Sequence, residues 1–153
     1  EEKWNSYFKF AFIREPKSWF KSHYTDNMLF YHHNHPSLHL LLENNFKLHD
    51  PEDNILKLND CIMFHVFLHR WFKASSMSKY IDLDLDFIGT LENFNEDMKH
   101  IFHKVGMKDE IIIPHSNKSD SLKYSFDEDS EKFLDITLKE DIELYNKVIK
   151  NAH

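Results

Sequence analysis

The clearest pattern of apolar and polar positions lies near the start of the chain. Residues 7–13 contain one polar side chain, Lys9. A short apolar run that ends at a turn signal predicts a strand buried on both faces. Pro16 suits the first position of a following helix, because the N–H that proline lacks would have no intrahelical partner there. The apolar face of that helix would carry Phe20, Tyr24, Met28 and Tyr31.

The rest of the chain shows mostly helical periodicity. Helices are predicted, in chain order, over residues 37–46, 53–73, 94–105 and 128–134, with a last helix after a capping box at 137–140. The acidic segment 50–53 is expected to begin the second of these helices. Residues 80–88 alternate between apolar and acidic side chains, which predicts a strand with one dry and one wet face. Together these elements predict a helix-rich α/β domain.

The composition indicates one folded domain over residues 1–153. Apolar residues make up 41% of the chain and aromatic residues 15%, enough for a packed core. The formal net charge of −7 argues against a nucleic-acid-binding surface but leaves room for a local cationic pocket that holds one nucleotide. We find no stretch with the length and hydropathy of a membrane span.

The lone cysteine bears on compartment and chemistry. Cys61 excludes a disulfide within the chain and favours the cytoplasm, whereas an anchor upstream of Glu1 would fit the Golgi lumen. Cys61 lies in an apolar run, so we expect a buried, inert thiol rather than a nucleophile.

The end of the first strand offers chemistry for a phosphate group. Arg14 follows the apolar run directly, and its guanidinium would supply a fixed charge and paired donors. The helix that begins at Pro16 would add unpaired N–H groups at its N-terminus, with hydroxyls nearby. The alternative is an ordinary strand–turn–helix with one surface arginine.

The residues around Arg14 also carry a family resemblance. Arg14-Glu15-Pro16, followed by Ser22 and Tyr24, resembles the 3′-phosphate-binding motif of sulfotransferases, closest to the carbohydrate type, sulfotransferase family 2. Glu15 stands where that motif has Asp, and Trp19 stands where it often has a second Arg. The resemblance implies that Arg14 and Ser22 bind the 3′-phosphate of 3′-phosphoadenosine 5′-phosphosulfate, the sulfate donor.

Two later segments resemble further elements of the same family. Residues 87–94 are similar to a strand that ends in a Gly-x-x-Glu turn, and by that similarity Leu91 packs near the adenine while Glu92 is structural. Residues 111–119 are similar to a late loop that returns a cation to the 3′-phosphate, here Lys118. The spacing of Asp141 and Tyr145 matches the acid–x–x–x–Tyr helix with which family members commonly end.

The resemblance implies a P-loop-type three-layer sulfotransferase fold with a parallel sheet. The chain has only Gly89 and Gly106, so it cannot form a glycine-rich phosphate loop. We therefore expect the N-terminal strand, that loop and the catalytic base upstream of Glu1, which makes this chain the C-terminal two-thirds of the domain and inactive by itself. Its catalytic residues are unknown.

Histidines and acidic residues raise the question of a metal. Four histidines lie within residues 32–39, and His65 and His69 have the i, i+4 spacing of a two-histidine site. Val66 stands where a zinc protease has Glu, and the alternating acids of residues 82–86 lack the glycine of a calcium loop. We expect no metal cofactor, a polar loop at 32–39, and packing or substrate-side roles for His65 and His69.

Two functions follow from these patterns. The first is a sulfotransferase that moves a sulfuryl group from the nucleotide donor to a hydroxyl or amine acceptor, with a carbohydrate preferred as acceptor. The second is a non-catalytic helical domain that binds a metal or a protein through its histidine-rich or acidic surface. Nucleic acid is not an expected partner in either case.

Overall fold

The computed structural model describes residues 6–26, 52–69, 76–81, 84–107 and 124–151. Helices are α2 (Pro16–Asp26), α5 (Leu58–Phe67), α6 (Phe94–Lys104), α7 (Glu128–Thr137) and α8 (Lys139–Asn151). Strands are β1 (Phe10–Ile13), β2 (Ile55–Leu56), β3 (Phe87–Thr90) and β4 (Ser125–Phe126), with 3₁₀ turns at Glu52–Asn54 and Ser78–Tyr80. The described part of the chain is therefore mixed α/β and rich in helix, as predicted.

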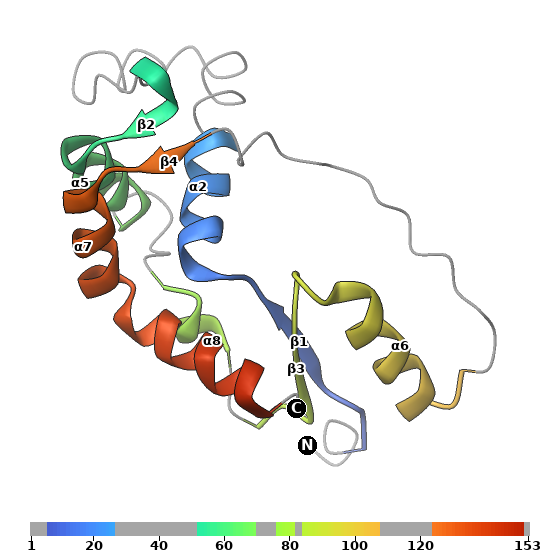
Figure 1. Cartoon of the computed structure of the whole chain (residues 1–153). Coiled ribbons are helices and arrows are strands. Elements are labelled where there is room, and N and C mark those ends of the chain that lie inside the picture. The colour runs from blue at the N-terminus through green and yellow to red at the C-terminus, as the bar shows by residue number, and fades with distance from the viewer. Residues whose placement is uncertain (1–5, 27–51, 70–75, 82–83, 108–123, 152–153) are drawn as a thin grey trace, which may run out of the picture.

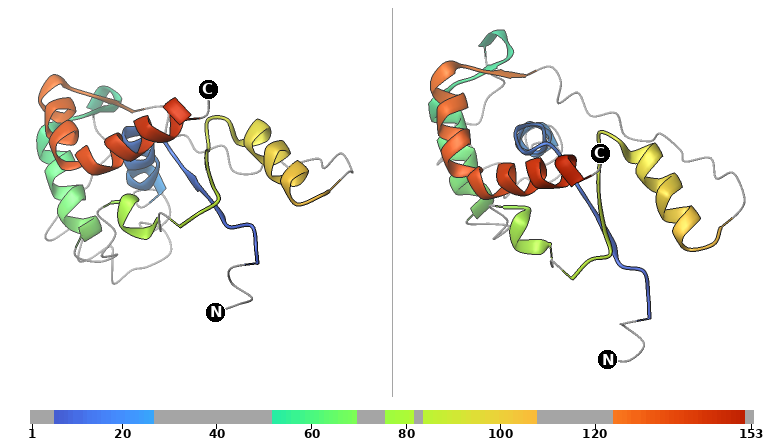
Figure 2. Two further views of the ribbon diagram at one scale, coloured as in Figure 1. Left: turned by 90° about the horizontal axis from the view of Figure 1, so that it is seen from below. Right: turned by 60° about the horizontal axis from the view of Figure 1, so that its bottom comes forward.

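Strands β1 and β3 run parallel and place their carboxyl ends side by side (Figure 1). Ile13 pairs with Thr90, the last residue of β3, so the turns that follow both strands leave from one edge. Helices α6 and α8 both contact β3, and in the rotated views α6 lies apart from the other helices (Figure 2). The parallel pairing agrees with the predicted sheet, while the three-layer P-loop arrangement stays a prediction.

The first strand is shorter and more exposed than its sequence indicates. It begins at Phe10 instead of Tyr7, and the Phe10 side chain is 44% exposed. Burial on both faces is therefore wrong at this end, although Ile13 is buried. The backbone N–H of Lys9, just before the strand, donates to the Asp86 carboxylate at 2.8 Å, which joins the entrances of β1 and β3.

The core lies between α2, α5, α7 and the β2–β4 pair. Phe20 and Tyr24 of α2 are fully buried, as the predicted stripe requires, while Met28 and Tyr31 lie outside the described residues. The buried cluster comprises Phe20, Tyr24, Leu56, Cys61, Phe64, Phe67, Leu68, Tyr124, Leu134 and Leu138. Cys61 is inaccessible, which confirms the predicted burial, and burial raises the pKa of its thiol to about 12.

The helix predicted to begin at Asp53 begins at Leu58 instead. Asp53 and Asn54 have positive φ angles of 58° and 56°, so the chain turns there and then extends through β2. Leu56 gains full burial by pairing in parallel with Phe126 of β4. The α5 helix uses a later acid at its start, because Asp60 accepts the Lys57 backbone N–H at 3.0 Å. Its predicted end at Lys73 lies outside the described residues.

The predicted strand 80–88 is also displaced. Residues Ser78–Tyr80 form a 3₁₀ turn, and β3 occupies Phe87–Thr90. The alternation of apolar and acidic residues placed the predicted strand too early in the sequence. Asp86 lies before β3, and its carboxylate accepts a hydrogen bond from the Lys9 backbone N–H. The following α6 helix lies where it was predicted, with Ile101 buried on its inner face.

Helix α7 ends three residues later than predicted, at Thr137 instead of Leu134, and α8 begins at Lys139. Thr137 is the final residue of α7, where its hydroxyl donates to the Phe133 carbonyl at 2.8 Å, so the capping box for α8 is wrong. The predicted helix 37–46, the histidines of residues 32–39 and Lys118 lie outside the described residues. In the part of the chain that is described, no helix has the length and apolar character of a membrane span.

Candidate functional site

The turns after β1 and β3 lie against each other and form the candidate site. The Leu91 backbone N–H donates to the Ile13 carbonyl at 2.8 Å, so Arg14 and Leu91 leave the sheet at neighbouring positions. The carboxyl edge of a parallel sheet is where open α/β folds bind ligands. The Leu91 side chain is 48% exposed there, which leaves its surface open for contact.

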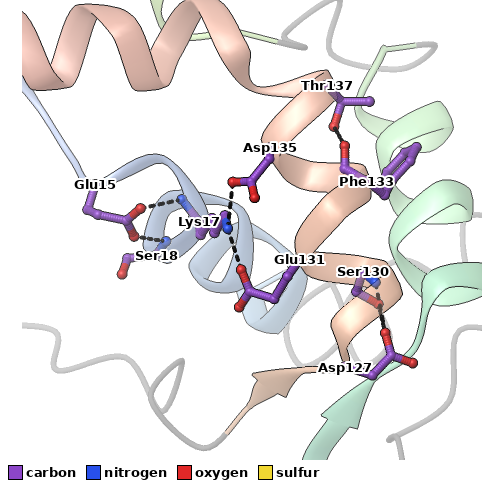
Figure 3. Close-up of polar contacts among 9 residues, drawn as sticks. All are labelled: Glu15, Lys17, Ser18, Asp127, Ser130, Glu131, Phe133, Asp135 and Thr137. Carbon is purple, nitrogen blue, oxygen red and sulfur yellow. Dashed lines mark hydrogen bonds and ion pairs between the residues drawn. The ribbon is translucent and has the colours of Figure 1, made fainter.

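Glu15 changes the expected role of the α2 N-terminus. Its carboxylate accepts the backbone N–H groups of Lys17 at 3.1 Å and Ser18 at 2.6 Å, so Glu15 caps its own helix (Figure 3). The prediction that this helix end offers unpaired N–H groups to a phosphate is therefore wrong. A carboxylate can do this because it is attracted to the positive end of the helix dipole.

Lys17 does not face the candidate site either. Its ammonium group contacts Glu131 and lies 2.7 Å from the Asp135 carboxylate on α7 (Figure 3). Burial alone would lower the Lys17 pKa, but hydrogen bonds to Asp135 and Glu131 outweigh it and leave the pKa above its ordinary value. The contacts fix the start of α2 against α7.

Glu92 links the two turns to the C-terminal helix. Its Oε1 atom accepts the Glu15 backbone N–H at 3.0 Å, and its Oε2 atom accepts the Tyr145 hydroxyl at 3.3 Å. Both partners are distant in the sequence, so one carboxylate joins the β1–α2 turn, the β3–α6 turn and α8. The structural role predicted for Glu92 fits these contacts, whereas its two partners were not predicted.

Backbone groups of the β3–α6 turn are hydrogen-bonded to nearby side chains. The Asp97 carboxylate accepts the Thr90 backbone N–H at 2.7 Å, and the Asn93 backbone N–H contacts the Thr90 hydroxyl at 3.3 Å. A Cβ atom at Gly89 would lie 2.6 Å from the Phe12 ring and 2.9 Å from Asp97. Close packing under the turn therefore leaves no room for a Cβ atom at Gly89 unless the Phe12 and Asp97 side chains move.

The residues expected to bind phosphate are grouped around α2. Ser22 lies on the second turn of α2 with 8% of its surface exposed. The pKa of His23, next to it, is lowered first by burial and also by the positive charge of Arg14, which outweigh the opposing charge of Asp26. The charge of Arg14 therefore acts on His23, the neighbour of Ser22.

Asp141 of α8 holds a second segment beside this helix. Its side chain is 1% exposed and accepts the Ser76 hydroxyl at 2.7 Å, the Met77 N–H at 3.0 Å and the Ser78 N–H at 2.8 Å. Asp141 and Tyr145 lie one helical turn apart, so α8 holds the 76–78 segment and the Glu92 turn at once. The i, i+4 spacing was the only sequence signal for this arrangement.

The environment of Tyr145 should be detectable as a raised pKa in an alkaline titration. Burial, followed by the charges of Glu92 and Glu15, raises the Tyr145 pKa from 10.0 to about 12. The unfolded chain ionises first, so this tyrosine's contribution to stability is present below pH 10 and lost as the pH rises through about 12. Phenolate absorbance should show that Tyr145→Phe removes a tyrosine that ionises later than an exposed one, while the buried Tyr24 and Tyr124 remain. If the tyrosine lost in this variant ionises near pH 10, the raised pKa is contradicted.

Among the residues that the structure describes, no group of three or more His, Cys, Asp or Glu side chains is arranged to hold a metal ion. The histidine-rich segment 32–39 lies outside those residues.

Comparison with known proteins gives one match. A sequence model of the group described as "Sulfotransferase family" matches residues 1–149, which is nearly the whole chain. No curated protein and no solved structure matches the chain.

Proposed function

Since the chain belongs to the sulfotransferase family, we propose that it binds the 3′-phosphoadenosine end of 3′-phosphoadenosine 5′-phosphosulfate for sulfuryl transfer. The acceptor in this proposal is a hydroxyl or amine, preferably on a carbohydrate. The observation that carries the proposal is the joining of the Arg14 and Leu91 turns at the carboxyl edge of β1 and β3. The two turns come from distant parts of the sequence, and each resembles a separate nucleotide-binding element of the family.

The proposed roles rest on the family resemblance and on the meeting of the two turns. Arg14 supplies charge and paired donors to the 3′-phosphate, and the Ser22 hydroxyl adds a neutral donor from α2. The phosphate is held by side chains in this proposal, because the Glu15 carboxylate occupies the N–H groups of Lys17 and Ser18. Leu91 offers an exposed apolar surface to the adenine. Lys118 stays a predicted additional cation.

The contribution of these residues to catalysis would be positional. Sulfuryl transfer is an in-line displacement, so its rate depends on how firmly the donor is held relative to the acceptor. Arg14 and Ser22 would anchor the donor by a phosphate that takes no part in bond breaking. Glu92 would fix the separation of the two turns, because its carboxylate bonds to the Glu15 backbone and to Tyr145.

A thermal shift with 3′-phosphoadenosine 5′-phosphate tests the nucleotide site without needing turnover. At one hundred times the Kd, the nucleotide should stabilise the fold by about 2.7 kcal/mol and raise the Tm by roughly 5–10 °C. Arg14→Ala should abolish the shift, since it removes both the charge and the paired donors. Arg14→Lys should keep part of it, because a lysine retains the charge but not the planar fork.

Lys99→Ala is the matched control for Arg14→Ala, because it also removes one positive charge. Lys99 is exposed on α6 and pairs with Glu96. This variant should keep the full nucleotide shift. A shift that survives Arg14→Ala would overturn the site assignment. A shift with zinc and none with the nucleotide would instead support a non-catalytic, metal-binding domain.

A further inference from the structure

A cavity separate from the nucleotide site lies where α5, the Ser78–Tyr80 turn and the α7–α8 junction meet. Its volume is about 370 Å³, and its lining includes His65 from α5, His69 just after α5, Lys79 from the 3₁₀ turn and Lys139 from α8. A volume of this order falls within the usual range for small-molecule pockets. Polar side chains from three elements converge on it, although the nucleotide proposal uses none of them.

One wall of the cavity is basic. His65 is half-buried, and its ring stands edge-on to Phe133 of α7, with the centroids 5.9 Å apart and the planes at 90°. The pKa of His65 is lowered first by burial, and then by the charges of His69 and Lys79. An anion placed between these groups would offset their mutual repulsion, which favours negative ligands on this wall.

The acids in the lining, Glu140 and Asp141, come from α8, and most of the acceptor capacity of Asp141 is committed. Asp141 is 1% exposed and already accepts hydrogen bonds from Ser76, Met77 and Ser78. Glu140 is exposed beside it, and the Lys139 ammonium lies 3.8 Å from Glu143. The hydroxyl of Thr137, also in the lining, donates to the Phe133 carbonyl. The basic side chains in the lining are His65, His69, Lys79 and Lys139, of which the first three lie together.

We propose that this cavity binds the oxyanion group of a small acidic ligand, with His65, His69 and Lys79 as its donors. The group is a sulfate or a similar tetrahedral oxyanion, borne by a sugar or present as the inorganic ion. This site is independent of the proposed nucleotide site, because it shares no side chain with the Arg14 and Leu91 turns. Arg14→Ala should therefore leave it intact.

Binding should strengthen as the pH falls. The groups that face His65 are His69, Lys79 on the 3₁₀ turn and the uncharged Phe133 ring on α7. Lys139, Glu140 and Asp141 line the cavity from α8. A bound anion raises the pKa of the His65 imidazole, so by linkage the protonated form binds the anion more tightly. We expect the affinity for sulfate to fall roughly tenfold between about pH 5.5 and about pH 7.5.

The experiment is an NMR titration of the histidine ring protons in the whole chain, with sodium sulfate against sodium chloride at equal ionic strength. The His65 resonance, assigned by its loss in His65→Gln, should shift saturably with sulfate, and its pKa should rise. Parallel titrations with glucose 6-sulfate and with glucose separate the two sources of the oxyanion. Tighter binding of the sugar sulfate than of inorganic sulfate indicates a sugar-borne ligand, and no saturable response to either sulfate overturns the proposal.

Variants in two different segments show whether a loss of sulfate binding comes from the lost side chain or from misfolding. Lys79→Gln and His69→Gln should each weaken sulfate binding about tenfold while the circular dichroism spectrum stays unchanged. Lys132→Gln is the matched control, because Lys132 lies on α7 paired with Glu128 and does not line the cavity. Equal sulfate affinity in Lys79→Gln, His69→Gln and Lys132→Gln would overturn the assignment.

Discussion

Replacing Asp141 by alanine is expected to lower the free energy of unfolding by about 3 kcal/mol. The substitution leaves the Ser76 hydroxyl and the N–H groups of Met77 and Ser78 without their acceptor in a site where the side chain is 1% exposed. Each buried donor that loses its partner costs about 1 kcal/mol or more. Urea denaturation followed by circular dichroism measures the change.

Two variants separate the lost hydrogen bonds from other effects of the Asp141 substitution. Asp141→Asn keeps one acceptor oxygen and should recover part of the loss. Glu140→Ala removes the neighbouring, exposed carboxylate and should change stability by at most about 0.5 kcal/mol. If Asp141→Ala is as mild as Glu140→Ala, the contact between α8 and the 76–78 segment does not hold the fold together.

Phe64→Ala is expected to destabilise the protein by about 3–5 kcal/mol. The Phe64 ring is fully buried at the meeting point of two helices, with its centroid 5.2 Å from Phe20 and 5.0 Å from Tyr24 of α2, both edge-on. Truncation removes this apolar surface and leaves a cavity that the rigid aromatic neighbours cannot fill. The midpoint of urea unfolding should fall accordingly.

Ile62→Ala is the matched control for Phe64→Ala, because Ile62 lies on the same helix with 37% of its side chain exposed. It should cost about 1 kcal/mol or less. Equal losses in both variants would mean that α5 does not bury the face carrying Phe64. A shift in the slope of the denaturation curve, rather than in its midpoint, would point to a change in the unfolded state.

The sequence predicted those helices whose apolar spacing agrees with their tertiary contacts. The starts of α2, α6 and α7 were predicted because Pro16, Phe94 and Glu128 coincide with strong local signals. The start of α5 was not, since Ile55 and Leu56 become a strand only by pairing with Ser125 and Phe126. A short window of sequence cannot predict a contact between segments that are so far apart in the chain.

The candidate site shows the same limit. The meeting of Arg14 and Leu91 could be predicted, because parallel strands end at one edge. The cap formed by Glu15 could not, since the choice between a helix N-terminus that binds phosphate and one that binds its own carboxylate depends on side-chain rotamers. The cavity around His65 needed the tertiary structure, because its walls come from α5, the Ser78–Tyr80 turn and α8.

The contact between Glu15 and Glu92 also sets an order of events during synthesis. The two residues are 77 positions apart in the sequence. At ribosomal rates of about 5–20 residues per second, the Arg14 turn emerges roughly 4–15 s before its partner. Tyr145 follows Glu92 by a further 53 residues, so the carboxylate that joins the two strand ends gains its second contact later still. The candidate site therefore cannot be completed until the segment around Tyr145 has been synthesised.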